Sequence, residues 1–216
     1  MKKIGIYGGS FDPIHLGHLN LAVEIMETHQ LDQVWFCPTA INPLKNQSQV
    51  SSQHRLNMLR LAIEKEPRFK ISELEINRTG LSYTIDTLNE LNALHNTENE
   101  HTFSLILGED AAHSFHQWKQ PEEIVKLVPI FIGARQESEG KPGSKHTFES
   151  FQGNTAVKDA LNRGLTKTRI MEISSQEIRK RLFNKKYCYH LVPAKVMDYI
   201  ITNHLYSLSL NETRFL

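Results

Sequence analysis

The segment from Gly8 to His18, with the sequence GGSFDPIHLGH, constrains the fold of this chain more than any other stretch. It follows a short apolar run, Ile4–Tyr7, and precedes an amphipathic run, Leu19–Met26. A strand, a glycine turn and a helix start in this order are typical of an α/β protein, in which phosphate binds where the N–H groups of a helix N-terminus converge. We therefore expect an anion site at this corner, with His15 and His18 at its opening.

Composition and charge narrow the class of protein. The 216 residues carry a formal net charge of +1, which indicates no polyanionic partner such as a nucleic acid. The two cysteines, Cys37 and Cys188, form no CxxC pair, and this favours a reduced, cytoplasmic protein over a metal or disulfide framework. The first apolar run ends at Gly8, too early for a signal peptide, and no run reaches the roughly 20 apolar residues of a membrane helix.

Apolar runs that predict buried strands alternate with runs at helical spacing along most of the chain. Expected strands cover 4–7, 34–37, 69–71, 103–107, 129–134 and 169–173, with 73–76 as an edge strand and 137–145 as a long loop. Expected helices cover 19–26, 56–63, 85–91, 156–161, 178–182 and 196–205, and Pro121 begins another. This alternation predicts an α/β fold with a doubly wound, mainly parallel sheet. We expect a single domain over 1–216, with a small C-terminal helical part from about 174.

Three segments are expected to meet at one edge of this sheet. They are the strand ends at Gly8-Gly9 and at Gly108, and the strand end before Ser174, because ligands of doubly wound sheets bind beyond the carboxyl ends of the strands. Ser174 and Glu177 form a capping box, with Ser174 as N-cap. A capped helix N-terminus with Arg179 one turn later favours a second anion site.

The segment Gly8–His18 matches neither a dinucleotide-binding GxGxxG pattern nor a Walker A loop. His15 and His18 have a spacing that could serve a metal ion, but no third ligand accompanies them, and a structural role is the other alternative. We favour imidazoles that hydrogen-bond phosphate oxygens and stabilise the charge that develops in phosphoryl-type transfer. Asp12 is expected to stabilise its turn by accepting hydrogen bonds from backbone N–H groups.

The pattern Gly-x-Phe-Asp-Pro-x-His-x-Gly-His resembles the signature of the nucleotidylyltransferase superfamily with the HxGH motif. Further segments resemble, in order, the bacterial nicotinate-nucleotide adenylyltransferases: 82–88 (SYTIDTL), 107–110 (LGED), Trp118, 173–179 (ISSQEIR) and 191–193 (LVP). The resemblance extends over nearly the whole chain. It implies a Rossmann-like nucleotidylyltransferase fold. It also implies transfer of the adenylyl group of ATP to nicotinate mononucleotide, giving nicotinate adenine dinucleotide and pyrophosphate in NAD biosynthesis.

The resemblance further implies roles for the residues that match the family motifs. It implies that His15 and His18 are the catalytic pair facing the triphosphate. The implied ATP-binding and phosphate-binding residues are Gly8, Gly9, Ser10, Phe11, Lys45, Ser174, Ser175 and Arg179. The implied residues for nicotinate mononucleotide are Thr84 near the carboxylate, Asp110 at the ribose, Trp118 stacked on the ring, and Arg135. The chain departs from the family at two places, because 42–45 reads NPLK in place of the frequent Pro-Pro-His-Lys, and Gln136 replaces the frequent Pro-Gly after Arg135.

The expected reaction is an in-line attack by the 5′-phosphate of nicotinate mononucleotide on the α-phosphorus of ATP, without a general base or a covalent intermediate. Mg²⁺ is expected to arrive with ATP, held by phosphates and water, with no metal site in the protein itself. Two alternatives stay open: nicotinamide mononucleotide as the acceptor, and a non-catalytic nucleotide-binding sensor. Phosphopantetheine adenylyltransferases usually carry Thr-x-Gly-His in place of HLGH, and cytidylyltransferases lack the Ser-Tyr-Thr and Gly-x-Asp segments. The sequence indicates no particular oligomeric state.

Overall fold

A parallel sheet forms the centre of the protein. The computed structural model describes residues 1–44, 48–95, 101–135, 148, 151–169 and 171–206, and within these ranges the sheet has six strands in the order β3-β2-β1-β4-β5-β6. Every neighbouring pair is parallel. The strands are β1 (Lys2–Gly9), β2 (Gln33–Pro38), β3 (Phe69–Ile71), β4 (His101–Gly108), β5 (Ile130–Arg135) and β6 (Leu165–Thr168). The order reverses between β1 and β4, which confirms the doubly wound sheet and places its switch point between these two strands.

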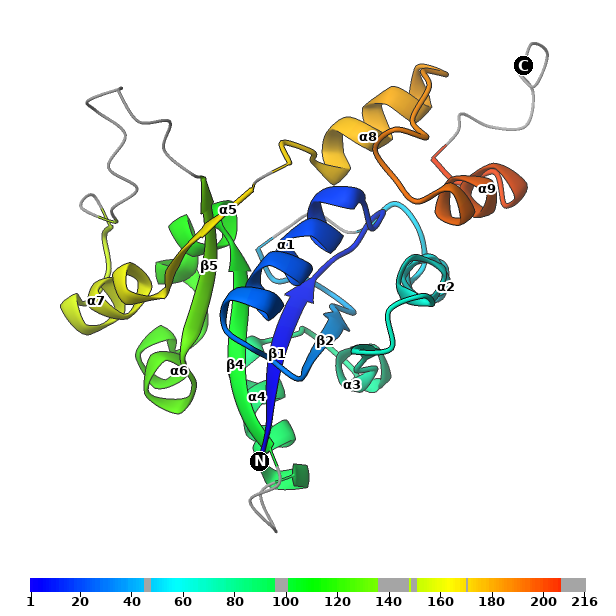
Figure 1. Cartoon of the computed structure of the whole chain (residues 1–216). Helices are drawn as coiled ribbons and strands as arrows, with labels where there is room; N and C mark the ends of the chain where they lie inside the picture. The colour runs from blue at the N-terminus through cyan, green and yellow to red at the C-terminus, as the bar shows by residue number, and fades with distance from the viewer. Residues whose placement is uncertain (45–47, 96–100, 136–147, 149–150, 170, 207–216) are drawn as a thin grey trace, which may run out of the picture.

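Helices cover both faces of the sheet (Figure 1). The core on one face receives side chains from α1 (Leu16–Thr28), α2 (Ser52–Ile63), α8 (Ser175–Phe183) and α9 (Ala194–Thr202). The core on the other face receives side chains from α3 (Leu74–Asn77), α4 (Thr84–His95), α5 (Glu109–His113), the 3₁₀ turn η1 (Phe115–Gln117), α6 (Pro121–Leu127) and α7 (Thr155–Gly164). Each helix expected from periodicity is present, although α9 ends at Thr202, earlier than the expected boundary at 205.

The central strand β1 shows why the alternation of polar and apolar residues is absent. Ile4 and Ile6 enter one core, Tyr7 enters the other, and all three are buried. A strand that is covered on both faces has no solvent side to mark with polar residues. The apolar run at 4–7 therefore correctly predicted a strand that is buried on both faces of the sheet.

Two of the expected strands are wrong. The segment expected as an edge strand at 73–76 contains helix α3, in which Glu75 is buried and accepts a hydrogen bond from the Thr87 hydroxyl at 2.9 Å. The strand expected at 169–173 is instead β6, which lies earlier in the chain and pairs with β5. The apolar signal missed β6 because it buries Thr166 and Thr168, whose hydroxyls donate to backbone carbonyls at 3.1 and 3.3 Å. The loop expected at 137–145 lies outside the described residues.

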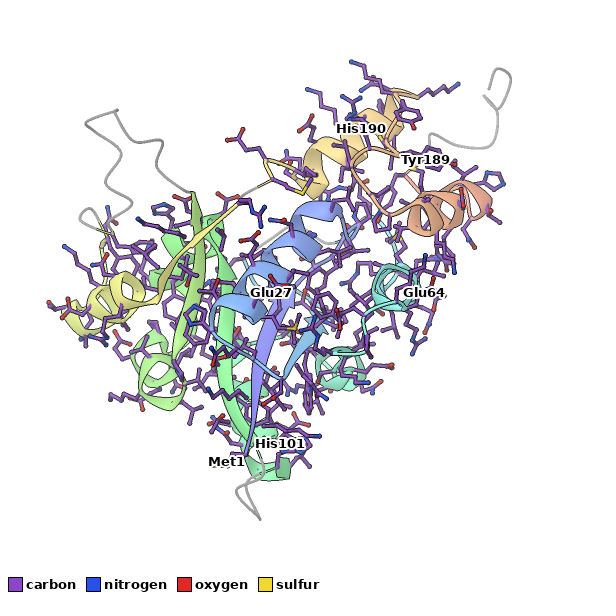
Figure 2. The ribbon with its side chains drawn as sticks, viewed as in Figure 1. Met1, Glu27, Glu64, His101, Tyr189 and His190 are labelled. Carbon is purple, nitrogen blue, oxygen red and sulfur yellow. The ribbon has the colours of Figure 1, made fainter. Side chains whose placement is uncertain are left out.

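The carboxyl ends of the strands lie toward the C-terminal helices. Met1 and His101 mark the opposite end of the molecule, whereas Tyr189 and His190 lie beyond the carboxyl ends, near α8 and α9 (Figure 2). None of the described helices has the length and apolar character needed to span a membrane. We propose, as the sequence predicts, that the chain is a single domain in which the residues from about 174 form a helical C-terminal part.

Candidate functional site

The loop between β1 and α1 is anchored in the core by the side chain of Phe11. This side chain is 2% exposed, and its ring contacts the rings of Tyr7, His18 and Phe36 at centroid distances of 5.6, 5.1 and 5.6 Å. A Cβ atom at Gly9 would lie 3.0 Å from the Phe11 ring, so the close approach of this ring favours glycine there. The backbone at 8–10 consequently remains at the surface, at the carboxyl end of β1, while Phe11 enters the core.

His15 and His18 start helix α1 by capping each other. His15 is the N-cap, and its Nδ1 accepts the backbone N–H of His18 at 3.3 Å. His18 is the third residue of the helix, and its Nδ1 accepts the backbone N–H of His15 at 3.3 Å. The rings stack with centroids 3.6 Å apart. This is a capping box built from two imidazoles, in the place where serine and glutamate are the usual pair.

The capping bonds decide which ring nitrogen carries the proton. Because each Nδ1 accepts a hydrogen bond, the proton of each neutral ring lies on Nε2. His15 is 5% exposed, and burial lowers its pKa from an ordinary 6.5 to about 4. At neutral pH His15 is therefore an uncharged imidazole, and it can serve a phosphate oxygen as an Nε2–H donor.

Helix α8 contacts the same loop. Ser174 caps α8 by accepting the backbone N–H of Glu177 at 3.1 Å, as predicted. The hydroxyl of Ser175 donates to the Pro13 carbonyl at 2.9 Å, and Nη1 of Arg179 donates to the Asp12 carbonyl at 2.6 Å. The N-termini of α1 and α8 are thereby brought to one place. A guanidinium has five N–H donors, so the bond to Asp12 leaves Arg179 with capacity for an anion.

The carboxylate of Asp12 points to distant segments. It is buried, and it accepts the Tyr206 hydroxyl at 2.6 Å and the backbone N–H of Gln49 at 3.2 Å. Asp12 thus accepts a backbone N–H, as predicted, but that N–H belongs to Gln49 in a distant segment and not to the turn of Asp12 itself. The carboxylate joins the loop after β1 to the segment before α2 and to the C-terminal segment, because the fold brings both beside it.

A second group of predicted residues lies along the same edge of the sheet. Thr84 begins α4, and Lys119 ties that helix start to the Trp118 segment. The Lys119 Nζ lies 3.0 Å from an oxygen of Asp86 and 4.7 Å from the centroid of the Tyr83 ring. These contacts bring two segments predicted for nicotinate mononucleotide to one place, although they are separated by more than thirty residues.

Asp110 and Trp118 differ in how firmly the fold holds them. Asp110 lies exposed in the first turn of α5, whose N-cap is Gly108, so helix capping does not explain this aspartate. Trp118 is half-buried, and its ring lies 4.9 Å from the Phe115 ring.

Two other predicted site residues are not fully described. Lys45 lies outside the described residues, and Arg135 is the last residue of β5, with its side chain outside the described part.

Sequence reasoning missed Arg55. This residue lies on α2 with a side chain that is 1% exposed, and its guanidinium donates to the Ser10 carbonyl at 2.7 Å. A signal was present, because Arg55 occupies the same helical face as the buried Met58 and Leu59. A cation on the apolar face of a helix indicates a buried partner.

Comparison with known proteins assigns this chain to a family. Residues 6–181 match the cytidylyltransferase-like family model. The chain is 36% identical over 211 residues to a protein of Oceanobacillus iheyensis named a probable nicotinate-nucleotide adenylyltransferase, covering 98% of this chain and 100% of that one. It is 40% identical over 207 residues to a Bacillus cytotoxicus protein of the same name, covering 95% and 99%. The chain belongs to the nicotinate-nucleotide adenylyltransferases.

Solved structures show the same fold. The Plasmodium falciparum nicotinic acid mononucleotide adenylyltransferase complexed with NaAD matches with a TM-score of 0.72 at 23% identity, covering 95% of this chain and 98% of that one. The same protein complexed with APC matches with a TM-score of 0.70. This confirms the Rossmann-like fold that the sequence predicted for this nicotinate-nucleotide adenylyltransferase. The roles of its individual residues stay predictions. The contacts of α8 with the loop after β1, and of Lys119 with the start of α4, support them.

Proposed function

We propose that this chain joins ATP and nicotinate mononucleotide, giving nicotinate adenine dinucleotide and pyrophosphate. Beside the family membership, one observation carries the proposal. The N-termini of α1 and α8 converge on the loop between β1 and α1, at the switch point of the sheet, and the segments of Thr84 and Trp118 follow strands that end at the same edge. Two substrates that must react with each other can bind side by side there.

The triphosphate of ATP would bind at the loop after β1. The Nε2–H groups of His15 and His18 would donate to phosphate oxygens, and so would backbone N–H groups of the segment 8–11, whose residues 8–10 lie at the surface. Ser175 and Arg179 would add a second set of donors from α8, with Ser174 holding that helix start in place. For Lys45, which lies outside the described residues, the family resemblance implies a contact with the same phosphates.

The nicotinate mononucleotide would bind on the other side of the switch point. Thr84 lies at the N-terminus of α4, where backbone N–H groups suit a carboxylate. Asp110 is exposed and can accept hydrogen bonds from ribose hydroxyls, and Trp118 offers a flat surface for the pyridine ring. Arg135, at the end of β5, would contribute positive charge.

The chemistry then needs positioning and charge stabilisation. The attacking phosphate oxygen is already ionised at neutral pH, so no side chain has to remove a proton. The residues of the site hold that oxygen in line with the α-phosphorus, and the histidine N–H groups stabilise the charge that grows as pyrophosphate leaves. The neutral state of His15 at neutral pH suits a donor role.

Mg²⁺ would accompany ATP and supply positive charge at the triphosphate. Within the described residues no group of three His, Cys, Asp or Glu side chains is placed to hold a metal ion. We propose a cation held mainly by phosphates and water, which is the usual preference of Mg²⁺. Both cysteines are buried free thiols, which fits a reducing compartment and supports our proposal that the enzyme works in the cytoplasm.

The decisive experiment offers ATP and Mg²⁺ with each mononucleotide separately. Pyrophosphate release is followed continuously, and the dinucleotide product is identified by mass spectrometry. We expect kcat/KM at least tenfold higher with nicotinate mononucleotide. A preference for nicotinamide mononucleotide would establish that acceptor instead. ATP binding without pyrophosphate release from either mixture would indicate the non-catalytic sensor and reject the proposal.

A further inference from the structure

Arg55 carries a buried charge directly behind the loop that follows β1. Its Nη1 donates to the Ser10 carbonyl at 2.7 Å, and its Nη2 donates to the Ala40 carbonyl at 3.3 Å. Ser10 lies just beyond β1 and Ala40 lies just beyond the neighbouring strand β2. One guanidinium therefore joins two loops at the carboxyl edge of the sheet.

The contacts continue from Ala40 to the start of α4. The backbone N–H of Ala40 donates to the Ser82 hydroxyl oxygen at 3.0 Å, and the backbone N–H of Ser82 donates to the Ile41 carbonyl at 2.9 Å. Thr84, which begins α4, follows two residues after Ser82. An unbroken series of hydrogen bonds and short backbone segments thus runs from Ser10 through Arg55 to the segment of Thr84.

The charge is retained although it is expensive to bury. Burial lowers the pKa of Arg55, and the nearby Asp12 carboxylate opposes that shift. The Nε of Arg55 is one of the buried side-chain atoms without a hydrogen-bond partner. An apolar residue at this point of α2 would fill the core without either cost. What an apolar residue lacks is the planar fork that reaches two carbonyls at once.

We propose that Arg55 is a positioning residue that sets the spacing between the two substrate subsites. It holds the backbone at Ser10, which faces the triphosphate, at a defined separation from the backbone at Ala40, and through Ser82 from the acceptor's segment. This inference rests on the proposed function. An in-line transfer is sensitive to this spacing, because a displacement of about 1 Å can lower the rate on the order of 100-fold while each substrate still binds.

The test separates turnover from binding. We compare wild type with Arg55→Met and Arg55→Lys, measuring kcat at saturating ATP and nicotinate mononucleotide, and the Kd of each ligand alone by calorimetry. For Arg55→Met we expect kcat to fall about 10- to 100-fold while each Kd stays within about threefold. The kcat of Arg55→Lys is expected to lie between those of wild type and Arg55→Met, because an ammonium group reaches one carbonyl in place of two. A folded Arg55→Met protein with kcat within twofold of wild type would overturn the proposal, and so would a loss that lies wholly in Kd.

A second variant keeps the test decisive where Arg55→Met prevents folding. Ser82→Ala breaks the series of contacts at its far end and leaves the Arg55 side chain in place, while it also removes the contact of the Ser82 hydroxyl with the buried Glu75 carboxyl. We expect kcat to fall about three- to tenfold with the Kd of ATP unchanged, and a wild-type kcat would overturn the proposal. Wild type is assayed first, since an inactive wild type rejects the proposed function itself, whereas an active one with unaffected variants rejects only the role of Arg55.

Tyr199→Phe is the matched control for loosening of α2. The Tyr199 hydroxyl lies on α9 and bonds to His54 and Asn57 of α2, each at 2.9 Å, and within the described residues it has no hydrogen bond to either loop. We expect a lower Tm with kcat within twofold of wild type. A loss of kcat as large as that of Arg55→Met would show that any loosening of α2 slows turnover, and would overturn the specific role of Arg55.

Discussion

The Nδ1 atoms of His15 and His18 each accept the backbone N–H of the other residue, at 3.3 Å in both directions. The two bonds satisfy donors at the start of α1, where the N–H of His18 also donates to the His15 carbonyl at 3.0 Å, and they place the proton of each neutral ring on Nε2. The same pair therefore begins a helix and presents the atom that would donate to a phosphate oxygen. Helix capping and the proposed chemistry use opposite sides of each imidazole.

The two uses of His18 can be separated by substitution. We expect His18→Ala and His18→Asn both to lower kcat roughly 10²- to 10³-fold, with a much smaller change in the Kd of ATP, because both remove the Nε2–H donor. Asparagine retains an acceptor near the position of Nδ1, so only His18→Ala should lose about 1 kcal/mol of cap stability. Steady-state kinetics, calorimetry and urea unfolding measure the three quantities. A wild-type kcat in His18→Asn would contradict the assigned role.

The lowered pKa of His15 predicts a pH-dependent stability. Between about 4, the folded value, and 6.5, the ordinary value, the unfolded chain binds more protons than the folded one, so stability falls as pH decreases through this window. The full shift corresponds to about 3 kcal/mol. His15→Asn keeps an N-cap side chain without this titration. Urea unfolding at several pH values should show a shallower loss for the variant, and equal slopes would contradict the prediction.

The start of α8 is predicted to bind ATP and to leave the acceptor site unaffected. Arg179→Met removes the guanidinium that contacts Asp12, and Ser175→Ala removes the hydroxyl that contacts Pro13. We expect the first to weaken ATP binding at least tenfold and the second by a few-fold, with the Kd of nicotinate mononucleotide unchanged. Lys180→Met is the charge-matched control, because Lys180 is exposed and is the residue that follows Arg179 within α8. An equal effect of Lys180→Met would mean that net charge alone is responsible.

Two glycines that flank the loop after β1, Gly8 in β1 and Gly17 in α1, are expected to respond differently to alanine. A Cβ at Gly17 would lie 3.1 Å from the His15 Nδ1 and 3.2 Å from the Met171 carbonyl oxygen, so Gly17→Ala should lower stability by about 1–3 kcal/mol. A Cβ at Gly8 would meet no atom within 4 Å. Gly8→Ala should therefore fold normally and weaken ATP binding only through the approaching phosphate. Thermal unfolding and calorimetry test both, and unchanged ATP affinity in Gly8→Ala would remove Gly8 from the phosphate site.

Local hydrophobic patterns predicted most of the strands and helices of this fold. Buried parallel strands such as β1 and β4 are continuous apolar runs, which the sequence displays directly. The pattern failed at β6, where Thr166 and Thr168 are buried because their hydroxyls find carbonyl partners. It also failed at α3, because four residues are too few to distinguish a strand period from a helical turn.

The candidate site divides in the same way. The capped start of α8 at Ser174 was predicted, since a cap depends on residues three positions apart, whereas the histidine cap of α1 was not predicted. Arg55 and Tyr206 were not readable, because their partners Ser10 and Asp12 lie 45 and 194 residues away in the chain. No periodicity encodes such distances. The position of Arg55 on an apolar helical face indicated a buried partner, and the folded structure shows that the partners are the Ser10 and Ala40 carbonyls.

By itself the sequence determined the alternation of strands and helices, the glycine turn after the first strand and the cap of α8. These features depend on neighbours within about four residues, and such neighbours are present whatever the rest of the chain does. The tertiary structure decided which loops meet. It put Ser175 and Arg179 on the carbonyls of Pro13 and Asp12, and Arg55 between Ser10 and Ala40. Those contacts exist because a parallel sheet gathers the carboxyl ends of its strands at one edge, where residues remote in sequence become neighbours.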